Sequence, residues 1–186
     1  MRIFLTLMVL AFSCGVTQDE SLEEKVKDYY QALNDQDAEA YLRLHLDSIR
    51  ILEGDYASSI SFRDYRKWLA WDSVFDPTYD ILDLKQDGDR VKVTVSKECK
   101  RIAFLNRAPV VNRELLTFRE GKVYSLEVVS STSFTQEWIE RRERLVAWVN
   151  ENHPELNGFI HDQTRQGALS YLQAMELYLD SNEVNE

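Results

Sequence analysis

Cysteine and histidine are scarce in this sequence, which has two cysteines and three histidines among 186 residues. His45, His153 and His161 lie far apart, and neither an HExxH nor a CxxC spacing occurs near them. A zinc site needs nitrogen and sulfur ligands at such spacings. The sequence therefore predicts no metal site, and because it has no specific cofactor-binding or catalytic motif, it predicts no cofactor and does not by itself indicate an enzyme.

Basic residues are also in deficit. The chain has 22 Lys and Arg against 32 Asp and Glu, which gives a formal net charge of −10 at pH 7. A surface with this charge repels the phosphates of nucleic acids and the headgroups of anionic lipids. We therefore expect no nucleic-acid partner, and we expect any attachment to a membrane to come from a covalent lipid.

The N-terminus has an apolar run that is too short to span a membrane, which takes about 20 residues. Residues 3–12 follow the charged start Met1-Arg2 and lead into Ser13-Cys14, the layout of an export signal. Residues 11–14 resemble the lipobox of bacterial lipoproteins. The resemblance implies a signal peptide at residues 1–13, a lipid on Cys14, and a tether over residues 14–20 that holds the protein at the outer membrane of a bacterial envelope. The alternative is an ordinary secretory peptide in which Cys14 is incidental.

The second cysteine, Cys99, has no partner within the chain if Cys14 is acylated, so no intramolecular disulfide is expected. A bridge between Cys14 and Cys99 remains the alternative for an unprocessed chain. We expect Cys99 to be a strand residue rather than a nucleophile, because no histidine is near it in sequence and no helix start is predicted there to lower the pKa of its thiol.

Capping patterns mark the starts of the predicted N-terminal helices. Ser21 and Glu24 form a capping box, and the helix after it carries an apolar stripe at Leu22, Val26, Tyr29 and Leu33. A polar break at residues 34–37 precedes a second helix over about residues 38–46. A short strand is expected over residues 49–53, and a third helix from Ser61 through Trp71.

The spacing of apolar residues changes from helical to alternating after Pro77. Strands are predicted over residues 79–85, from Val91 toward Phe104, over 110–119 and over 122–129, with tight turns at Asp87-Gly88 and Glu120-Gly121. Short turns between neighbouring strands indicate an antiparallel sheet. Two amphipathic helices are expected after it, from residue 133 to about 152 and from 164 to about 179, so the fold class is α+β.

The order of these elements resembles the NTF2-like, or SnoaL-like, superfamily. Residues 29–42, YYQALNDQDAEAYL, are similar to its first two helices, and residues 116–124, LTFREGKVY, to its last hairpin. The resemblance implies a cone of helices packed on a curved antiparallel sheet over residues 21–130, and leaves residues 131–186 as a helical extension. This fold hosts enzymes, ligand-binding proteins and adaptors, so it does not fix an activity.

Ketosteroid isomerase has this layout, and the resemblance implies one specific set of catalytic residues. It places the oxyanion-binding tyrosine at Tyr29, the base at Glu53 and the protonated acid at Glu114. Strand alternation puts Glu53 on the face of Ile51 and Glu114 on the face of Leu116, so both are expected to point into the cone. The alternative is structural, with Tyr29 in the core and the two glutamates at a strand end and a sheet surface.

We therefore expect a lipid-anchored, non-catalytic module that binds a small apolar ligand in the cone or a protein partner on the sheet. The alternative is a small isomerase or dehydratase that uses Tyr29, Glu53 and Glu114. The two C-terminal helices are expected to fold back onto their own domain and limit ligand entry, although a homodimer formed through them remains open.

Overall fold

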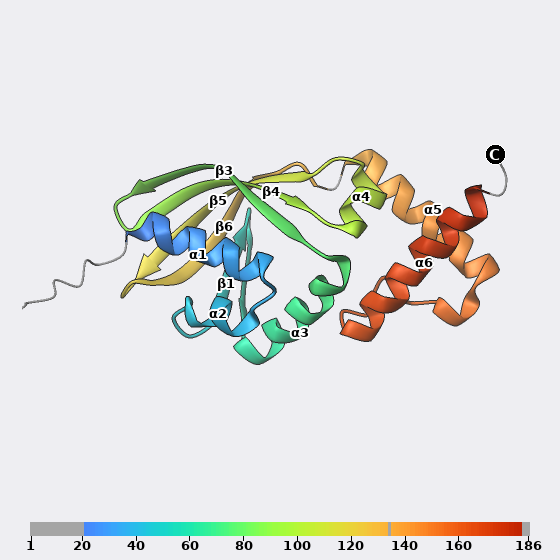
Figure 1. The fold of residues 1–186 in the computed structure, drawn as a ribbon, viewed down its shortest axis with the longest axis horizontal. Coiled ribbons are helices and arrows are strands. Elements are labelled where there is room, and N and C mark those ends of the chain that lie inside the picture. The colour runs from blue at the N-terminus through green and yellow to red at the C-terminus, as the bar shows by residue number, and fades with distance from the viewer. Residues whose placement is uncertain (1–20, 134, 184–186) are drawn as a thin grey trace, which may run out of the picture.

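The computed structural model describes residues 21–133 and 135–183, which form an α+β fold with a curved sheet and six α-helices (Figure 1). The α+β class expected from the sequence is confirmed. The predicted signal peptide, Cys14 and the tether lie outside the described residues. No helix in the described part of the chain is long and apolar enough to cross a membrane.

The sheet has six strands in the order β2-β1-β6-β5-β4-β3. All neighbours are antiparallel except β1 and β6, which are parallel. Register shifts interrupt β3 once and the pairing of β5 with β6 twice, and such bulges bend a sheet. The strand bounds are Ile49–Glu53 (β1), Tyr56–Ile60 (β2), Thr78–Asp87 (β3), Arg90–Glu98 (β4), Val110–Arg119 (β5) and Lys122–Ser131 (β6).

Three N-terminal helices lie on the concave side of this sheet: α1 (Leu22–Asn34), α2 (Ala38–Arg43) and α3 (Phe62–Asp72). The side chains of Ser21, Asp37 and Ser61 accept a backbone N–H at the start of each helix, as the capping patterns predict. Their apolar faces meet the inward side chains of β4, β5 and β6 in one core cluster, whose fully buried members include Val26, Tyr41, Val91, Leu116 and Val123.

Two elements differ from the sequence expectation. β2 was not predicted; it is an edge strand that pairs with β1, and its small residues Ala57, Ser58 and Ser59 give little apolar alternation. The strand predicted to continue toward Phe104 is wrong, because residues Lys100–Asn106 form helix α4.

Cys99 is therefore the N-cap of α4 rather than a strand residue. Its Sγ atom accepts the backbone N–H of Ile102 at 3.4 Å. Burial raises the pKa of the Cys99 thiol, so its position at a helix start does not make it a reactive thiolate.

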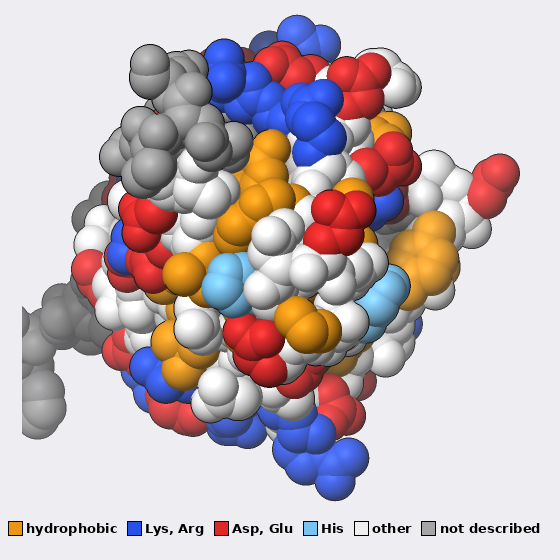
Figure 2. Space-filling view, turned by 90° about the vertical axis from the view of Figure 1, so that its right-hand side faces the viewer, with side chains coloured by type: hydrophobic (Ala, Val, Ile, Leu, Met, Phe, Trp, Pro, Cys, Tyr) orange, Lys and Arg blue, Asp and Glu red, His pale blue; other side chains and the backbone are white. Residues whose placement is uncertain are grey.

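The C-terminal helices α5 (Gln136–Asn152) and α6 (Arg165–Glu183) form a hairpin, with the 3-10 helix η2 (Pro154–Leu156) between them. They contact α3, α4 and the 3-10 helix η1 (Ser73–Phe75) at one end of the sheet (Figure 1). This contact forms a second core cluster, centred on Phe75, Trp138, Leu145 and Tyr171. The outer surface at this end mixes both charges with scattered hydrophobic side chains (Figure 2).

Candidate functional site

A buried carboxylic acid lies between helix α1 and the concave face of the sheet. Glu114, on β5, is 8% exposed. Its Oε2 atom accepts the Tyr30 hydroxyl at 2.6 Å, and its Oε1 atom accepts the Asn112 amide at 3.0 Å. Burial raises the pKa of Glu114, and the two hydrogen bonds lower it by less. Both carboxylate oxygens are therefore already occupied within the core.

An ion pair lies farther along the same face. Asp72, at the end of α3, is 3% exposed, and its two oxygens accept the Lys97 ammonium of β4 at 3.0 and 2.8 Å. The Tyr79 hydroxyl donates to Asp72 Oδ2 at 3.3 Å. The Lys97 ammonium also lies 5.0 Å from the ring centre of Tyr79 and 5.5 Å from that of Trp68. Such a pair is costly to desolvate, and the added hydrogen bond and ring contacts compensate part of that cost.

Three buried tyrosine hydroxyls, one each from α1, α2 and α3, form a third polar cluster. The Tyr29 and Tyr41 hydroxyls are 2.8 Å apart, and Tyr41 donates to Tyr65 at 3.1 Å. Burial raises the pKa of all three phenols. His45 packs on the rings of Tyr29 and Tyr41, and burial lowers its pKa to about 4, so it is neutral at pH 7. These side chains fill the interior that a ligand in the cone would need.

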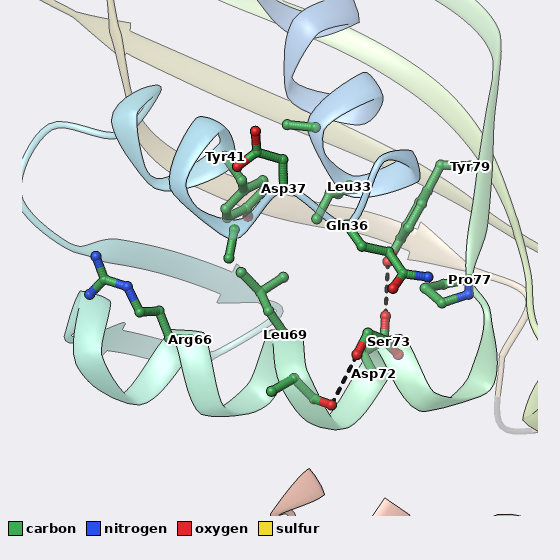
Figure 3. A pocket seen from close by; sticks show the side chains of 13 residues that line it. Leu33, Gln36, Asp37, Tyr41, Arg66, Leu69, Asp72, Ser73, Pro77 and Tyr79 are labelled. Carbon is green, nitrogen blue, oxygen red and sulfur yellow. Dashed lines mark hydrogen bonds between the residues drawn. The ribbon is translucent and has the colours of Figure 1, made fainter.

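A cavity of about 240 Å³ opens between the α1–α2 turn, α3 and the start of β3 (Figure 3). Tyr79 and Asp72 lie at one end of it, joined by their hydrogen bond, and Leu33 and Leu69 face each other across it (Figure 3). No α5 or α6 residue is among its lining residues, which are Ala32, Leu33, Gln36, Asp37, Ala38, Tyr41, Arg66, Leu69, Ala70, Asp72, Ser73, Pro77 and Tyr79. The C-terminal hairpin packs on the other side of α3, so the expected restriction of ligand entry by α5 and α6 does not apply to this cavity.

The structure separates the three residues of the isomerase hypothesis. Tyr29 is bonded to Tyr41, whereas its neighbour Tyr30 contacts Glu114. Glu53 is exposed at the end of β1. Glu53 and Glu114 both pair in register with Val128, which puts them on one face of the sheet, two strands and about 10 Å apart. None of Tyr29, Glu53 and Glu114 lines the cavity.

Sequence reasoning missed Tyr30, Asp72 and Lys97 as site residues. One signal was present, because Lys97 continues the inward alternation of Val91, Val93 and Val95 along β4. A lysine in the apolar register of a strand indicates a buried cation that needs an acidic partner. No comparable signal marks Asp72, since helical spacing alone does not show which polar residue at a helix end is buried.

The buried charge of Glu114 predicts a pH effect on stability. The pKa of Glu114 is higher in the folded chain than its ordinary 4.5. The contribution of Glu114 to the free energy of unfolding is therefore most favourable below pH 4.5 and is lost as pH rises through the folded-state pKa. We expect Glu114→Gln to gain stability relative to the unmodified chain between pH 5 and pH 8. Its amide retains the bond from Tyr30 and offers a donor to Asn112 Oδ1, a buried atom without a hydrogen-bond partner among the described residues.

Thermal melts across this pH range provide the measurement. The exposed Glu53→Gln is the matched control, and its stability is expected to follow that of the unmodified chain. If the melting temperature of Glu114→Gln changed with pH in the same way as those of Glu53→Gln and the unmodified chain, a raised pKa of Glu114 would be contradicted.

Among residues 21–133 and 135–183, no group of three or more His, Cys, Asp or Glu side chains is placed to hold a metal ion. The lining of the cavity offers no cluster of basic groups for a phosphate, and Arg66 already binds Glu39 through two hydrogen bonds of 2.7 and 3.1 Å. The arrangement suits a small, uncharged molecule with an apolar body and one hydroxyl group, which the Asp72–Tyr79 end can bind.

Neither a protein-family model nor a curated protein sequence matches this chain. Solved structures do. IdmH from Streptomyces antibioticus, a proposed polyketide cyclase, is 14% identical over 67% of this chain and 99% of its own, with a TM-score of 0.52. A protein from Kribbella flavida is 12% identical over 66% of this chain and 93% of its own, with a TM-score of 0.51.

An NTF2-like protein of unknown function from Cytophaga hutchinsonii is also similar, at 13% identity over 60% of this chain and 91% of its own, with a TM-score of 0.48. At such identities the likeness concerns the fold alone. With its helices on the concave side of a curved, mainly antiparallel sheet, this chain has an NTF2-like, or SnoaL-like, fold.

Proposed function

We propose that this chain is a lipid-anchored protein of the bacterial envelope whose NTF2-like domain binds a small, largely apolar molecule without transforming it. The observation that supports binding most directly is the cavity beside α3, where Leu33 and Leu69 face each other and the hydrogen-bonded Asp72 and Tyr79 form one end (Figure 3). Ligand sites are typically apolar hollows with a few placed polar groups. At about 240 Å³, this one suits a molecule of roughly ten non-hydrogen atoms or fewer.

The expected catalytic groups are not accessible to a substrate in the cavity. A catalytic acid or base must reach the reacting atom within hydrogen-bond distance. Glu114 is buried and has both oxygens bonded to Tyr30 and Asn112. The tyrosine at the expected position, Tyr29, is bonded to Tyr41 instead. The cavity holds no carboxylate other than Asp37, which caps α2, and Asp72, which is paired with Lys97.

An isomerase or dehydratase is the second candidate, and one observation favours it. Glu53 and Glu114 are both in register with Val128 on the strand between them. The expected base, Glu53, and the buried acid, Glu114, therefore lie on the same face of the sheet. A reaction there would need Glu114 to release Tyr30 or Asn112 and open toward Glu53. This candidate predicts loss of cellular function in both Glu53→Gln and Glu114→Gln, whereas the binding proposal predicts that both variants function.

We test binding with benzyl alcohol, a probe that has an apolar ring and one hydroxyl group. We expect it to shift the amide NMR signals of Leu33, Leu69 and Tyr79 at millimolar concentration, as suits a ligand of so few atoms. Ala70→Leu, which places a larger side chain in the cavity, is expected to weaken the shifts by roughly tenfold, a loss of about 1.4 kcal/mol.

The matched control is Ala147→Leu, at an exposed position of helix α5. It makes the same change of side chain far from the cavity, and binding is expected to be unchanged. Equal affinity in the two variants would show that the probe binds elsewhere and would remove the support for a ligand in this cavity.

The lipid anchor has its own test. We expect protein extracted from membranes to have lost residues 1–13 and to carry acyl chains on Cys14, as intact-mass measurement would show. The buried thiol of Cys99 supports this assignment, because it is not placed at the surface to meet Cys14. Recovery of a soluble full-length chain with a bridge between the two cysteines would contradict the anchor.

A further inference from the structure

The outward face of four strands is unexpectedly basic for a chain with this net charge. Side chains on this face alternate with the buried residues of β1, β4, β5 and β6. We call this surface the basic face. Its acidic side chains are Glu127 and, at the far end of β4, Glu98, and its basic side chains are Arg50, Arg90, Lys92, Arg113, Arg119 and Lys122. Edge strand β3, beside β4, borders this surface with Asp80, Asp83, Lys85 and Asp87 on the same side of the sheet.

The cations of the basic face are almost free of ion pairs. In the described part of the chain, Lys92 alone among them has a carboxylate within 4.0 Å, that of Asp87 at 3.4 Å in a solvent-exposed pair. Arg50 and Arg119 lie over the ring of Tyr124, at 4.6 and 3.4 Å from its centre. Arg50 also donates to the Tyr124 hydroxyl at 3.0 Å and is half-buried. The exposed guanidinium groups of Arg90, Arg113 and Arg119 keep donors available for an anionic partner.

The basic face is next to the point where the chain enters the fold. Helix α1 starts beside the turns that join β3 to β4 and β5 to β6, at the end of the sheet away from α5 and α6 (Figure 1). Lys25 donates to the Gly121 carbonyl at 2.9 Å, and the Gln86 amide donates to Glu23 at 2.9 Å. Residues 15–20 reach at most about 20 Å, so a lipid on Cys14 would hold this end close to the bilayer.

We propose that the basic face lies against anionic phospholipid headgroups and orients the domain on its membrane, with the C-terminal helices directed away. The orientation of the anchored protein rests on the lipid anchor proposed above. A covalent anchor makes the contact intramolecular, so that a weak electrostatic attraction is sufficient to orient the domain. A second copy packed face to face would set cations against cations, which opposes a dimer through this surface.

The test uses the chain without residues 1–13 and with Cys14→Ser, which keeps every described residue and removes both the apolar signal and the lipid. We expect it to sediment at low salt with phosphatidylcholine vesicles that contain phosphatidylglycerol, and not with phosphatidylcholine alone. The variant Arg90→Glu/Arg113→Glu/Arg119→Glu is expected to bind at least roughly tenfold more weakly, since each basic residue near an anionic surface adds attraction. The matched control Arg63→Glu/Arg144→Glu/Arg165→Glu makes the same change of net charge elsewhere and is expected to bind more tightly than the basic-face variant.

Equal losses in the two triple variants, or no preference for phosphatidylglycerol, would overturn the proposal. So would a dimer in sedimentation velocity that the basic-face variant dissociates. Thermal melts check folding, and the milder triple Arg→Gln variant at positions 90, 113 and 119 is expected to weaken binding by a smaller factor. Because this chain is not acylated, the result is independent of the intact-mass test of the anchor.

Discussion

Lys97→Met is expected to lower the free energy of unfolding by about 3–5 kcal/mol, because removing one partner of a buried ion pair leaves the other charge uncompensated. Asp72 is 3% exposed and would retain only the 3.3 Å hydrogen bond from Tyr79. Urea denaturation measures the change. Since Asp72 also lines the cavity, we expect the affinity of Lys97→Met for benzyl alcohol to fall together with its stability.

Two variants isolate the ion pair. Lys92→Met removes an exposed lysine from the same strand, and it is expected to change stability by at most about 0.5 kcal/mol. In Lys97→Met/Asp72→Leu both charges are gone, and we expect most of the stability to return. A Lys97→Met effect no larger than that of Lys92→Met would contradict the buried pair.

Phe75→Ala is expected to cost about 3–5 kcal/mol, the usual loss for a buried phenylalanine. Phe75 is fully buried in η1, where its ring centre lies 5.0 Å from that of Trp71 and 5.7 Å from that of Tyr171. It therefore connects α3 to α6. Because α3 also forms one wall of the cavity, the variant should lower the stability of the helical hairpin and of the cavity together.

The measurement is urea denaturation followed both by far-UV circular dichroism and by the NMR signals of α1 and α6. We expect coincident transitions for the unmodified chain. Leu179→Ala, at a half-exposed position of α6, is the control and should cost much less. Separate transitions for α1 and α6, with Phe75→Ala shifting that of α6 alone, would show that the hairpin is an independent unit.

Local patterns predicted most of the elements, because the physics that forms them is local. The caps at Ser21, Asp37 and Ser61 are hydrogen bonds within one turn, and the Glu120-Gly121 turn needs two residues with positive φ, which it has. Helix α4 was missed because alternation along β4 leads into it without a proline or glycine, and its cap is a cysteine. Edge strand β2 was missed because it has few apolar residues to alternate.

The site was less predictable because it depends on how separate elements are rotated against one another. The resemblance placed the catalytic tyrosine at Tyr29, but the adjacent Tyr30 meets Glu114. One position along a helix changes the direction of a side chain by about 100°, and the sequence does not fix the rotation of α1 over the sheet. The basic face was missed for a related reason. The net charge of −10 is a sum over the whole chain and does not show how the charges are distributed between the faces of the fold.

A crystal structure of the protein grown with benzyl alcohol tests most directly that the cavity beside α3 is the functional site. We predict the ring between Leu33 and Leu69, with the hydroxyl within hydrogen-bond distance of Asp72 or Tyr79 and with the Tyr30–Glu114 bond intact. Benzyl alcohol bound between Glu53 and Glu114, with the cavity beside α3 empty, would contradict the account and support the isomerase or dehydratase instead.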